Sequence, residues 1–248
     1  MMHRPEGSCQ HSFEAGAARH EDRIVTSWHT NATPWTHAVR TRAIDTRRLV
    51  TDQAILEAVL SRSPRSVLDL GCGEGWLARA LNGAGVDVLG VDIVPQLIEA
   101  ARLSGGGSFR VGSYADLVAT SNDGSWQRVD VAVCNFALLG DESVAAVLRA
   151  VPQLLIPAGT LIVQTLHPLM ACGDAPYRDG WREGSWQGFS SEFSDPAPWY
   201  FRTLQSWVQL YTDSGLRLLE IREPLHPTSG RPASVIFIAT VATLAASR

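Results

Sequence analysis

One stretch of this sequence decides the fold: Val67-Leu-Asp-Leu-Gly71-Cys-Gly73-Glu-Gly75-Trp76, in which an apolar strand runs into a glycine-rich turn and then a helix. Glycines in such a turn let the backbone approach a bound ligand closely. A dinucleotide-binding turn spaces its glycines as G-x-G-x-x-G, whereas here the third glycine is Gly75 and Trp76 follows it. The spacing therefore disfavours a pyrophosphate ligand.

Two carboxylates accompany this turn. Asp69 precedes the first glycine closely, where it would repel a phosphate and attract an ammonium group. Asp92 ends the next apolar run, about 20 residues beyond Gly71, the spacing at which a carboxylate accepts hydrogen bonds from ribose hydroxyls. Together they predict a ligand that has an adenosyl group and an amino-acid tail.

Apolar runs and helix-like segments alternate after Pro64, which is typical of an α/β protein with a parallel, doubly wound sheet. The predicted strands are Ser66–Leu70, Val86–Val91, Ser108–Val111, Val129–Cys134, Thr160–Thr165, Leu216–Arg222 and Ser234–Thr240. The predicted helices are Ile44–Leu60, Glu74–Leu81, Pro95–Leu103, Tyr114–Ala119, Asp141–Leu155 and Arg202–Thr212. The last two strands are expected to pair as a hairpin.

The rest of the chain is expected to surround this sheet. Residues 1–20 have no apolar periodicity and are predicted to be a flexible tail, and residues 21–248 to form one domain with an N-terminal helical cover. Residues 167–201 interrupt the alternation with glycine, proline and many aromatic residues. We interpret this insertion as a lid.

Composition limits the function. The net charge is -4 and no basic run is present, which disfavours a nucleic-acid partner. Four cysteines without an apolar leader favour reduced thiols and a cytoplasmic location, and no metal-ligand spacing joins them. No apolar run approaches the roughly 20 residues needed to span a bilayer, so we expect no membrane association.

The segments 67–75 and 91–92, with the strands that follow them, resemble the motifs of class I S-adenosylmethionine-dependent methyltransferases over about residues 45–240. The resemblance implies a Rossmann-like, seven-stranded, mostly parallel sheet whose last strand is antiparallel, with helices on both faces. It also implies S-adenosylmethionine as cofactor and S-adenosylhomocysteine as product. The residues that it assigns to the cofactor are Asp69, Gly71, Cys72, Gly73, Asp92, Ile93, Ser113, Tyr114, Asn135 and Phe136.

Each of these assignments has a structural alternative. A glycine turn can simply join a strand to a helix, Asp92 can cap a helix, and Phe136 can belong to the core. All of these residues nevertheless follow strands of the predicted sheet, and ligands of open α/β sheets bind at the carboxyl edge. Their coincidence there favours the cofactor site.

The acceptor is predicted less directly. His167 follows the fifth strand and is a candidate general base, although a loop histidine can also bond only to backbone. Trp28, Tyr177, Trp186 and Tyr200 are candidates for an acceptor pocket, or for a satellite core under the lid.

We therefore predict methylation of a small, aromatic or heteroaromatic molecule on nitrogen, oxygen or carbon, in specialised metabolism, by a monomer or homodimer. The alternative is a sensor of S-adenosylmethionine or S-adenosylhomocysteine, or a non-catalytic subunit. A nicotinamide oxidoreductase is disfavoured by the glycine spacing.

Overall fold

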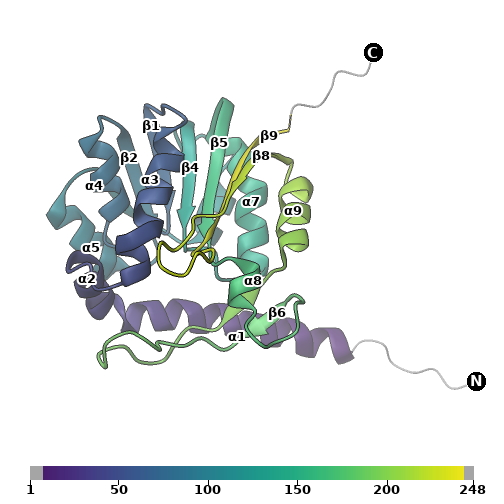
Figure 1. Ribbon diagram of the computed structural model, residues 1–248. Coiled ribbons are helices and arrows are strands. Elements are labelled where there is room, and N and C mark those ends of the chain that lie inside the picture. The colour runs from purple at the N-terminus through teal and green to yellow at the C-terminus, as the bar shows by residue number, and fades with distance from the viewer. Residues whose placement is uncertain (1–7, 243–248) are drawn as a thin grey trace, which may run out of the picture.

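A computed structural model describes residues 8–242, and its centre is one seven-stranded sheet with the strand order β3-β2-β1-β4-β5-β9-β8 (Figure 1). Strands β1 to β5 run parallel, whereas β9 is antiparallel to both of its neighbours. The bounds are β1 Ser66–Leu70, β2 Asp87–Asp92, β3 Ser108–Val111, β4 Val129–Asn135, β5 Leu155–Thr165, β8 Leu216–Arg222 and β9 Val235–Val241. The predicted fold class and the closing hairpin are confirmed.

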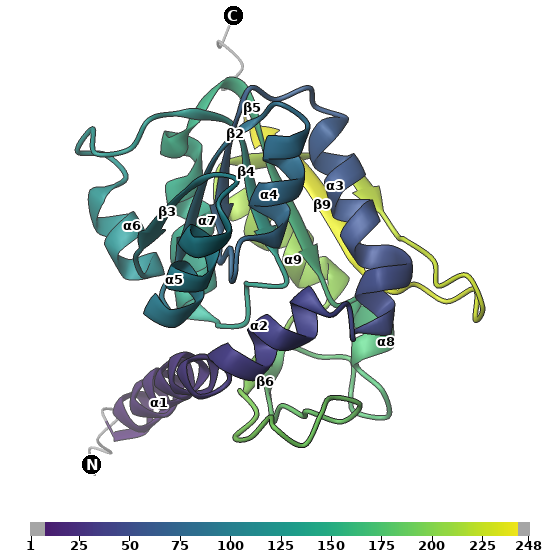
Figure 2. The same ribbon diagram turned by 90° about the vertical axis from the view of Figure 1, so that its left-hand side faces the viewer.

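Helices cover both faces of this sheet (Figure 2). The helices α3 (Asp52–Leu60), α4 (Trp76–Gly83) and α5 (Pro95–Ser104) lie on one face, and α6 (Tyr114–Thr120), α7 (Glu142–Leu154) and α9 (Leu204–Asp213) on the other. Because successive strand side chains point to opposite faces, Val133 packs with the first group and Cys134 with the second. Two apolar layers result, which explains why the central strands are apolar throughout.

The remaining elements gather beyond the carboxyl ends of the parallel strands (Figures 1 and 2). They are the helices α1 (Ser8–Thr30) and α2 (Ala32–Arg40), the π-helical turn η1 (Arg47–Thr51), and the insertion with α8 (Pro168–Ala171), β6 (Gly180–Arg182) and β7 (Trp199–Phe201). Strands β6 and β7 form a small antiparallel pair that the sequence did not predict. The N-terminal helices and the insertion therefore face the edge of the sheet at which ligands of such sheets bind.

The predicted tail is wrong from Ser8 onward, because helix α1 begins there; residues 1–7 lie outside the described part. Glu21 explains how this polar helix docks. Its Oε1 accepts a hydrogen bond from the Asp141 backbone N–H at 2.9 Å, and its Oε2 accepts one from the Ser143 hydroxyl at 2.7 Å. Helix α1 thus supplies acceptors to the start of α7, a polar contact that apolar periodicity cannot reveal. No helix within residues 8–242 is long and apolar enough to cross a bilayer.

Candidate active site

A cavity of about 440 Å³ lies at the carboxyl edge of the sheet, within the size range of small-molecule sites. We call its strand-end side the floor, formed by Asp69, Gly71, Cys72, Gly73, Asn135, Phe136 and Thr165. We call its opposite side the roof, formed by Trp28, Trp35, Trp186, Phe189 and Trp199. The floor belongs to the sheet, and the roof belongs to the N-terminal helices and the insertion.

The glycine turn shapes the floor. Gly71 and Gly73 have φ values of +76° and +56°, a region that side-chain-bearing residues rarely adopt. A methyl group on Gly71 would overlap the Cβ of Ala137, whereas one on Gly73 would meet no atom nearer than the Trp35 Nε1 at 3.6 Å. The turn therefore packs tightly on one side and leaves room for a ligand on the other.

Asp69 is a buried carboxylate that lacks a partner. Asp69 is only 1% exposed and lines the cavity. No described residue donates a hydrogen bond to either of its carboxylate oxygens. Burial, and secondarily the charge of Asp92, raise the pKa of Asp69 to about 7. A buried carboxylate without a donor is costly, so this site suits a ligand that brings an ammonium group.

Asp92 and Ile93 lie beside the turn without lining the cavity. The Asp92 carboxylate accepts hydrogen bonds from the backbone N–H groups of Gly73 and Val94, each at 2.9 Å. Burial raises the pKa of Asp92, although these donors oppose the shift. Ile93 packs near Trp28 of helix α1. Both residues therefore hold the turn and the cover, and their contact with a ribose or adenine stays a prediction.

Ser113 and Tyr114 also stand outside the cavity lining. Ser113 caps helix α6 in a capping box with Asp116, so its hydroxyl is already engaged. The Tyr114 hydroxyl donates to the Ala137 carbonyl oxygen at 3.1 Å, and burial raises its pKa. These contacts explain both residues structurally, and an adenine contact is not needed to account for them.

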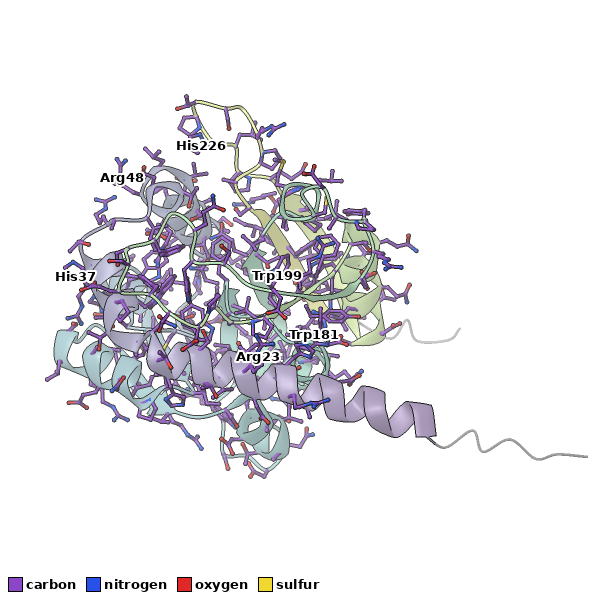
Figure 3. All side chains as sticks on the ribbon, turned by 90° about the horizontal axis from the view of Figure 1, so that it is seen from below. Arg23, His37, Arg48, Trp181, Trp199 and His226 are labelled. Atoms are coloured by element: carbon purple, nitrogen blue, oxygen red, sulfur yellow. The ribbon has the colours of Figure 1, made fainter. Side chains whose placement is uncertain are left out.

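Arg47 is a cavity residue that the sequence analysis missed. It lies on η1, its guanidinium stacks 4.9 Å from the Trp76 ring centroid, and its Nε donates to Asp52 at 2.9 Å. Its Nη2 is buried and has no hydrogen-bond partner among the described residues. Arg48, by contrast, lies at the surface in an ion pair with Asp45 (Figure 3). The π turn selects which arginine points inward, and no sequence pattern distinguishes them.

Asp69 and Arg47 make the cavity complementary to an amino-acid tail. A carboxylate suits the ammonium of S-adenosylmethionine, and a planar guanidinium suits its carboxylate. Both groups line one cavity, the Arg47 Nη2 has no hydrogen-bond partner among the described residues, and the Asp69 carboxylate accepts no hydrogen bond from them, so the residues present fit the cofactor at its methionine end.

Only half of the predicted acceptor residues line the cavity. Trp28 and Trp186 do, and their ring centroids lie 5.9 Å apart edge to face. Tyr177 does not, because its hydroxyl accepts a hydrogen bond from the Leu204 N–H at 2.9 Å. Tyr200 does not either, since it packs edge to face with Trp181 in the β6–β7 pair. Both tyrosines make contacts within or beside the insertion, and their contact with an acceptor stays a prediction.

His167 does not line the cavity. The residue is 2% exposed, it precedes helix α8, and its Nε2 lies 2.7 Å from the Glu223 Oε1 at the end of β8. The structure therefore places His167 beside Glu223 rather than in the cavity wall, and its role as general base stays a prediction. His37 is exposed, His226 lies on a projecting loop (Figure 3), and neither lines the cavity.

Comparison with known proteins agrees with this geometry. A family model described as a methyltransferase domain matches residues 40–221. Ubiquinone biosynthesis O-methyltransferase of Xylella fastidiosa is 36% identical over 117 residues, which are 45% of this chain and 46% of that protein. The corresponding protein of Xanthomonas campestris is 38% identical over 106 residues, or 41% and 43%. This chain spans a little under half the length of these curated relatives.

Solved structures show the same fold at low identity. Burkholderia thailandensis 1,6-didemethyltoxoflavin-N1-methyltransferase, with bound 1,6-didemethyltoxoflavin and S-adenosylhomocysteine, is 19% identical with a TM-score of 0.61. That alignment covers 98% of this chain and 94% of the other. An S-adenosylmethionine-dependent methyltransferase from Mesorhizobium loti is 23% identical with a TM-score of 0.55, covering 74% and 97%.

The chain therefore belongs to the methyltransferase-domain family, and its class is that of the class I S-adenosylmethionine-dependent methyltransferases.

Proposed function

We propose that this chain transfers a methyl group from S-adenosylmethionine to a small, flat aromatic or heteroaromatic acceptor. The observation that carries the proposal is the unpartnered Asp69 carboxylate, which lies at the floor of a cavity whose roof is aromatic. Trp186 contacts Trp28 and Phe189 edge to face, leaving ring surfaces for a flat ligand. The named relatives that methylate small molecules support this acceptor class.

When bound, S-adenosylmethionine supplies an electrophilic methyl group on a positively charged sulfur. The protein's task is to align the acceptor with that methyl group and to exclude water. Asp69 and Arg47 would hold the amino-acid tail, and the roof tryptophans would cover the acceptor. The strand-end floor sets the alignment because its residues are held by the sheet.

Among the described residues that line the cavity, none is left to act as general base on the acceptor once Asp69 is assigned to the ammonium group of the cofactor. The titratable residues that line the cavity are Arg47, Asp69, Cys72 and Glu74. Glu74 is fully buried and accepts hydrogen bonds from Arg40 and Arg79. Burial raises the pKa of the Cys72 thiol, so no thiolate is available at neutral pH. Alignment and desolvation therefore carry catalysis, and the favoured acceptors are those whose own nucleophile is already unprotonated near neutral pH.

A screen for S-adenosylhomocysteine formation tests this proposal. Purified protein is incubated with S-adenosylmethionine and a panel of acidic phenols, acidic enols and nitrogen heterocycles, with aliphatic amines and alcohols as the comparison set. We expect product with flat acceptors and none with the aliphatic set. Trp186→Ala should raise the acceptor KM by about 10-fold, the scale of a lost aromatic contact, and leave S-adenosylhomocysteine affinity nearly unchanged. Turnover confined to aliphatic acceptors would contradict the proposal.

A further inference from the structure

A chain of buried hydrogen bonds ends at the cavity floor. The Ser234 hydroxyl donates to the Gln164 Oε1 at 3.0 Å. The Gln164 Nε2 donates to the Thr51 backbone carbonyl at 3.0 Å and to the Asn135 Oδ1 at 2.7 Å. Gln164 is 1% exposed and Ser234 is fully buried. The side-chain amide of Gln164 thus joins strands β4 and β5 to the residue before β9 and to the turn η1.

The Thr51 carbonyl fixes which atoms donate and which accept along this series of hydrogen bonds. A backbone carbonyl can only accept, so the Gln164 amide must present its Nε2 to Thr51. The same Nε2 then reaches Asn135, which must present its Oδ1 in return. The amide orientation of Asn135 follows, and its Nδ2 is left on the other side. Asn135 lines the cavity, and no described residue accepts a hydrogen bond from Nδ2.

We propose that Asn135 is a specificity-determining residue whose Nδ2 donates a hydrogen bond to a carbonyl-type oxygen of the acceptor, with Gln164 as its positioning residue. This inference rests on the proposed function and names the acceptor class more narrowly. The acceptor carries a lone-pair oxygen close to the atom that receives the methyl group. Flat lactams and fused pyrimidinediones meet this description, whereas carbonyl-free rings do not.

The position of Asn135 favours the acceptor over the cofactor. In the sheet order, β4 and β5 lie on the side of β1 opposite β2, and β2 carries Asp92. The sequence predicts the adenosyl group near Asp92, and Asp69 is proposed to hold the methionine tail, so these two assignments leave the β4–β5 side for the acceptor. The cavity extends along this side, since Thr165, the last residue of β5, and Leu166 after it also line the cavity.

Thr51 supports a polar subsite at the same place. Thr51 is 1% exposed and lines the cavity. Its Oγ1 is buried and has no hydrogen-bond partner among the described residues. A hydroxyl both donates and accepts, so it complements an N–H or a second oxygen of the same ring. Two polar groups that lack partners among the described residues, on residues that line one cavity, favour a ligand that provides the missing hydrogen bonds.

Paired probes test the inference on protein saturated with S-adenosylhomocysteine, so that no turnover occurs. The probes are lumazine, a fused pyrimidinedione, and indole, a flat bicycle without a carbonyl, and their affinities are measured by calorimetry. We expect lumazine to bind at least about 10-fold more tightly than indole, the effect of one satisfied hydrogen bond.

Two variants then assign the residues. Asn135→Leu should lower lumazine affinity by about 10-fold and leave indole affinity within about 3-fold. Gln164→Leu should reduce the lumazine-to-indole ratio in the same direction, because it frees the Asn135 amide to rotate. A merely structural role of Gln164 would weaken both probes equally and leave the ratio unchanged. The matched control Asn122→Leu, at an exposed asparagine, should leave both affinities and the ratio unchanged.

The outcomes separate this inference from the proposed function. Equal binding of the two probes, tighter binding of indole, no binding of lumazine, or an unchanged ratio in Asn135→Leu would each overturn the role of Asn135. If S-adenosylhomocysteine still binds in those cases, the methyltransferase proposal stands. If S-adenosylhomocysteine does not bind the wild-type chain, the proposed function fails first and this inference fails with it.

Discussion

The floor and the roof of the cavity are held in place by different interactions. The floor is built on paired parallel strands, and its turn is tied to β2 by hydrogen bonds from the Gly71 and Cys72 N–H groups to the Val91 carbonyl oxygen. The roof consists of aromatic side chains on the N-terminal helices and on the insertion, and side-chain contacts hold these two segments together. This difference favours a rigid cofactor site at the floor and an acceptor pocket whose roof can be changed without changing the floor.

One buried asparagine joins the two parts of the roof. The Asn31 Nδ2 donates to the Ser194 carbonyl oxygen at 2.8 Å, and the Asn31 Oδ1 accepts from the Ser194 N–H at 3.0 Å. The Trp186 Nε1 donates to the same carbonyl at 2.8 Å. Helix α2 begins directly after Asn31, so this residue couples the helical cover to the insertion. Changes at the glycine turn and at Asp69 should therefore affect cofactor affinity and stability, and changes in the roof should affect mainly the acceptor.

The largest effect is expected at the floor, for Gly71→Ala. The added methyl group overlaps Ala137, and the residue has a positive φ, so we expect destabilisation by about 3 kcal/mol from overpacking and backbone strain. Calorimetry and thermal unfolding should show weaker S-adenosylhomocysteine binding and a lower Tm. Gly83→Ala is the matched control, because no atom lies within 4 Å of its added Cβ and it sits in a helix. Equal effects of the two substitutions would contradict the tight packing of the turn.

The second effect concerns the charge of Asp69. Its pKa in the folded protein is about 7, above its ordinary value of 3.8, so the unfolded chain loses this proton first as pH rises. The folded state is therefore penalised progressively from about pH 4 to about pH 7, and the penalty persists at higher pH. Asp69→Asn removes it, so the Tm advantage of the variant over wild type should grow between pH 4 and pH 8.

The same substitution should weaken cofactor binding. Replacing the carboxylate removes a charge-assisted hydrogen bond, which we expect to lower S-adenosylmethionine affinity at pH 8 by about 10- to 100-fold. Higher stability with lower affinity would identify Asp69 as a ligand-binding group that destabilises the unliganded fold. If stability and affinity both fall, Asp69 is instead a structural residue.

A third effect is expected in the roof, for Asn31→Ala. This change removes the buried hydrogen bonds to Ser194, so amide hydrogen exchange at Ser194 should accelerate by at least about 10-fold. Acceptor KM should rise, while S-adenosylhomocysteine affinity stays within about 3-fold of wild type. A loss of cofactor affinity as large as that of Asp69→Asn would show that roof and floor are not separable.

The smallest effect is expected for Arg23→Ala, which also affects a contact between α1 and the insertion. Arg23 pairs with Glu183 at 3.0 Å, but both side chains are exposed. Figure 3 shows Arg23 on helix α1, on the same side of the molecule as Trp181. Exposed ion pairs contribute little, so acceptor KM and Tm should remain close to wild type. A change as large as that of Asn31→Ala would show that surface charge, rather than the buried asparagine, holds the insertion.

Local patterns allowed much of the fold and the floor to be predicted. The apolar runs located the sheet strands with small shifts, because buried parallel strands are apolar along their whole length. Asp69, Gly71, Cys72, Gly73, Asn135 and Phe136 were predicted for the site and line the cavity. Their positions follow from one rule, that parallel strands deliver their carboxyl ends to one edge.

The roof depends on contacts between distant segments, and there prediction was weaker. Helix α1 docks through Glu21, which no periodicity marks. Trp186 and Tyr200 are both aromatic residues of the insertion, yet only Trp186 lines the cavity, since Tyr200 lies in the short β6–β7 pair. Arg47 faces inward because of a π turn whose presence the sequence does not signal. These outcomes depend on tertiary packing rather than on residue type.

The most direct test of the account is a parallel calorimetric titration of the wild-type chain with S-adenosylmethionine, S-adenosylhomocysteine and NAD at pH 8. The unpartnered Asp69 carboxylate and the glycine spacing predict binding of the first two and none of NAD. Binding of NAD without S-adenosylmethionine would contradict the floor as a site for an amino-acid tail, and with it the proposed methyl transfer.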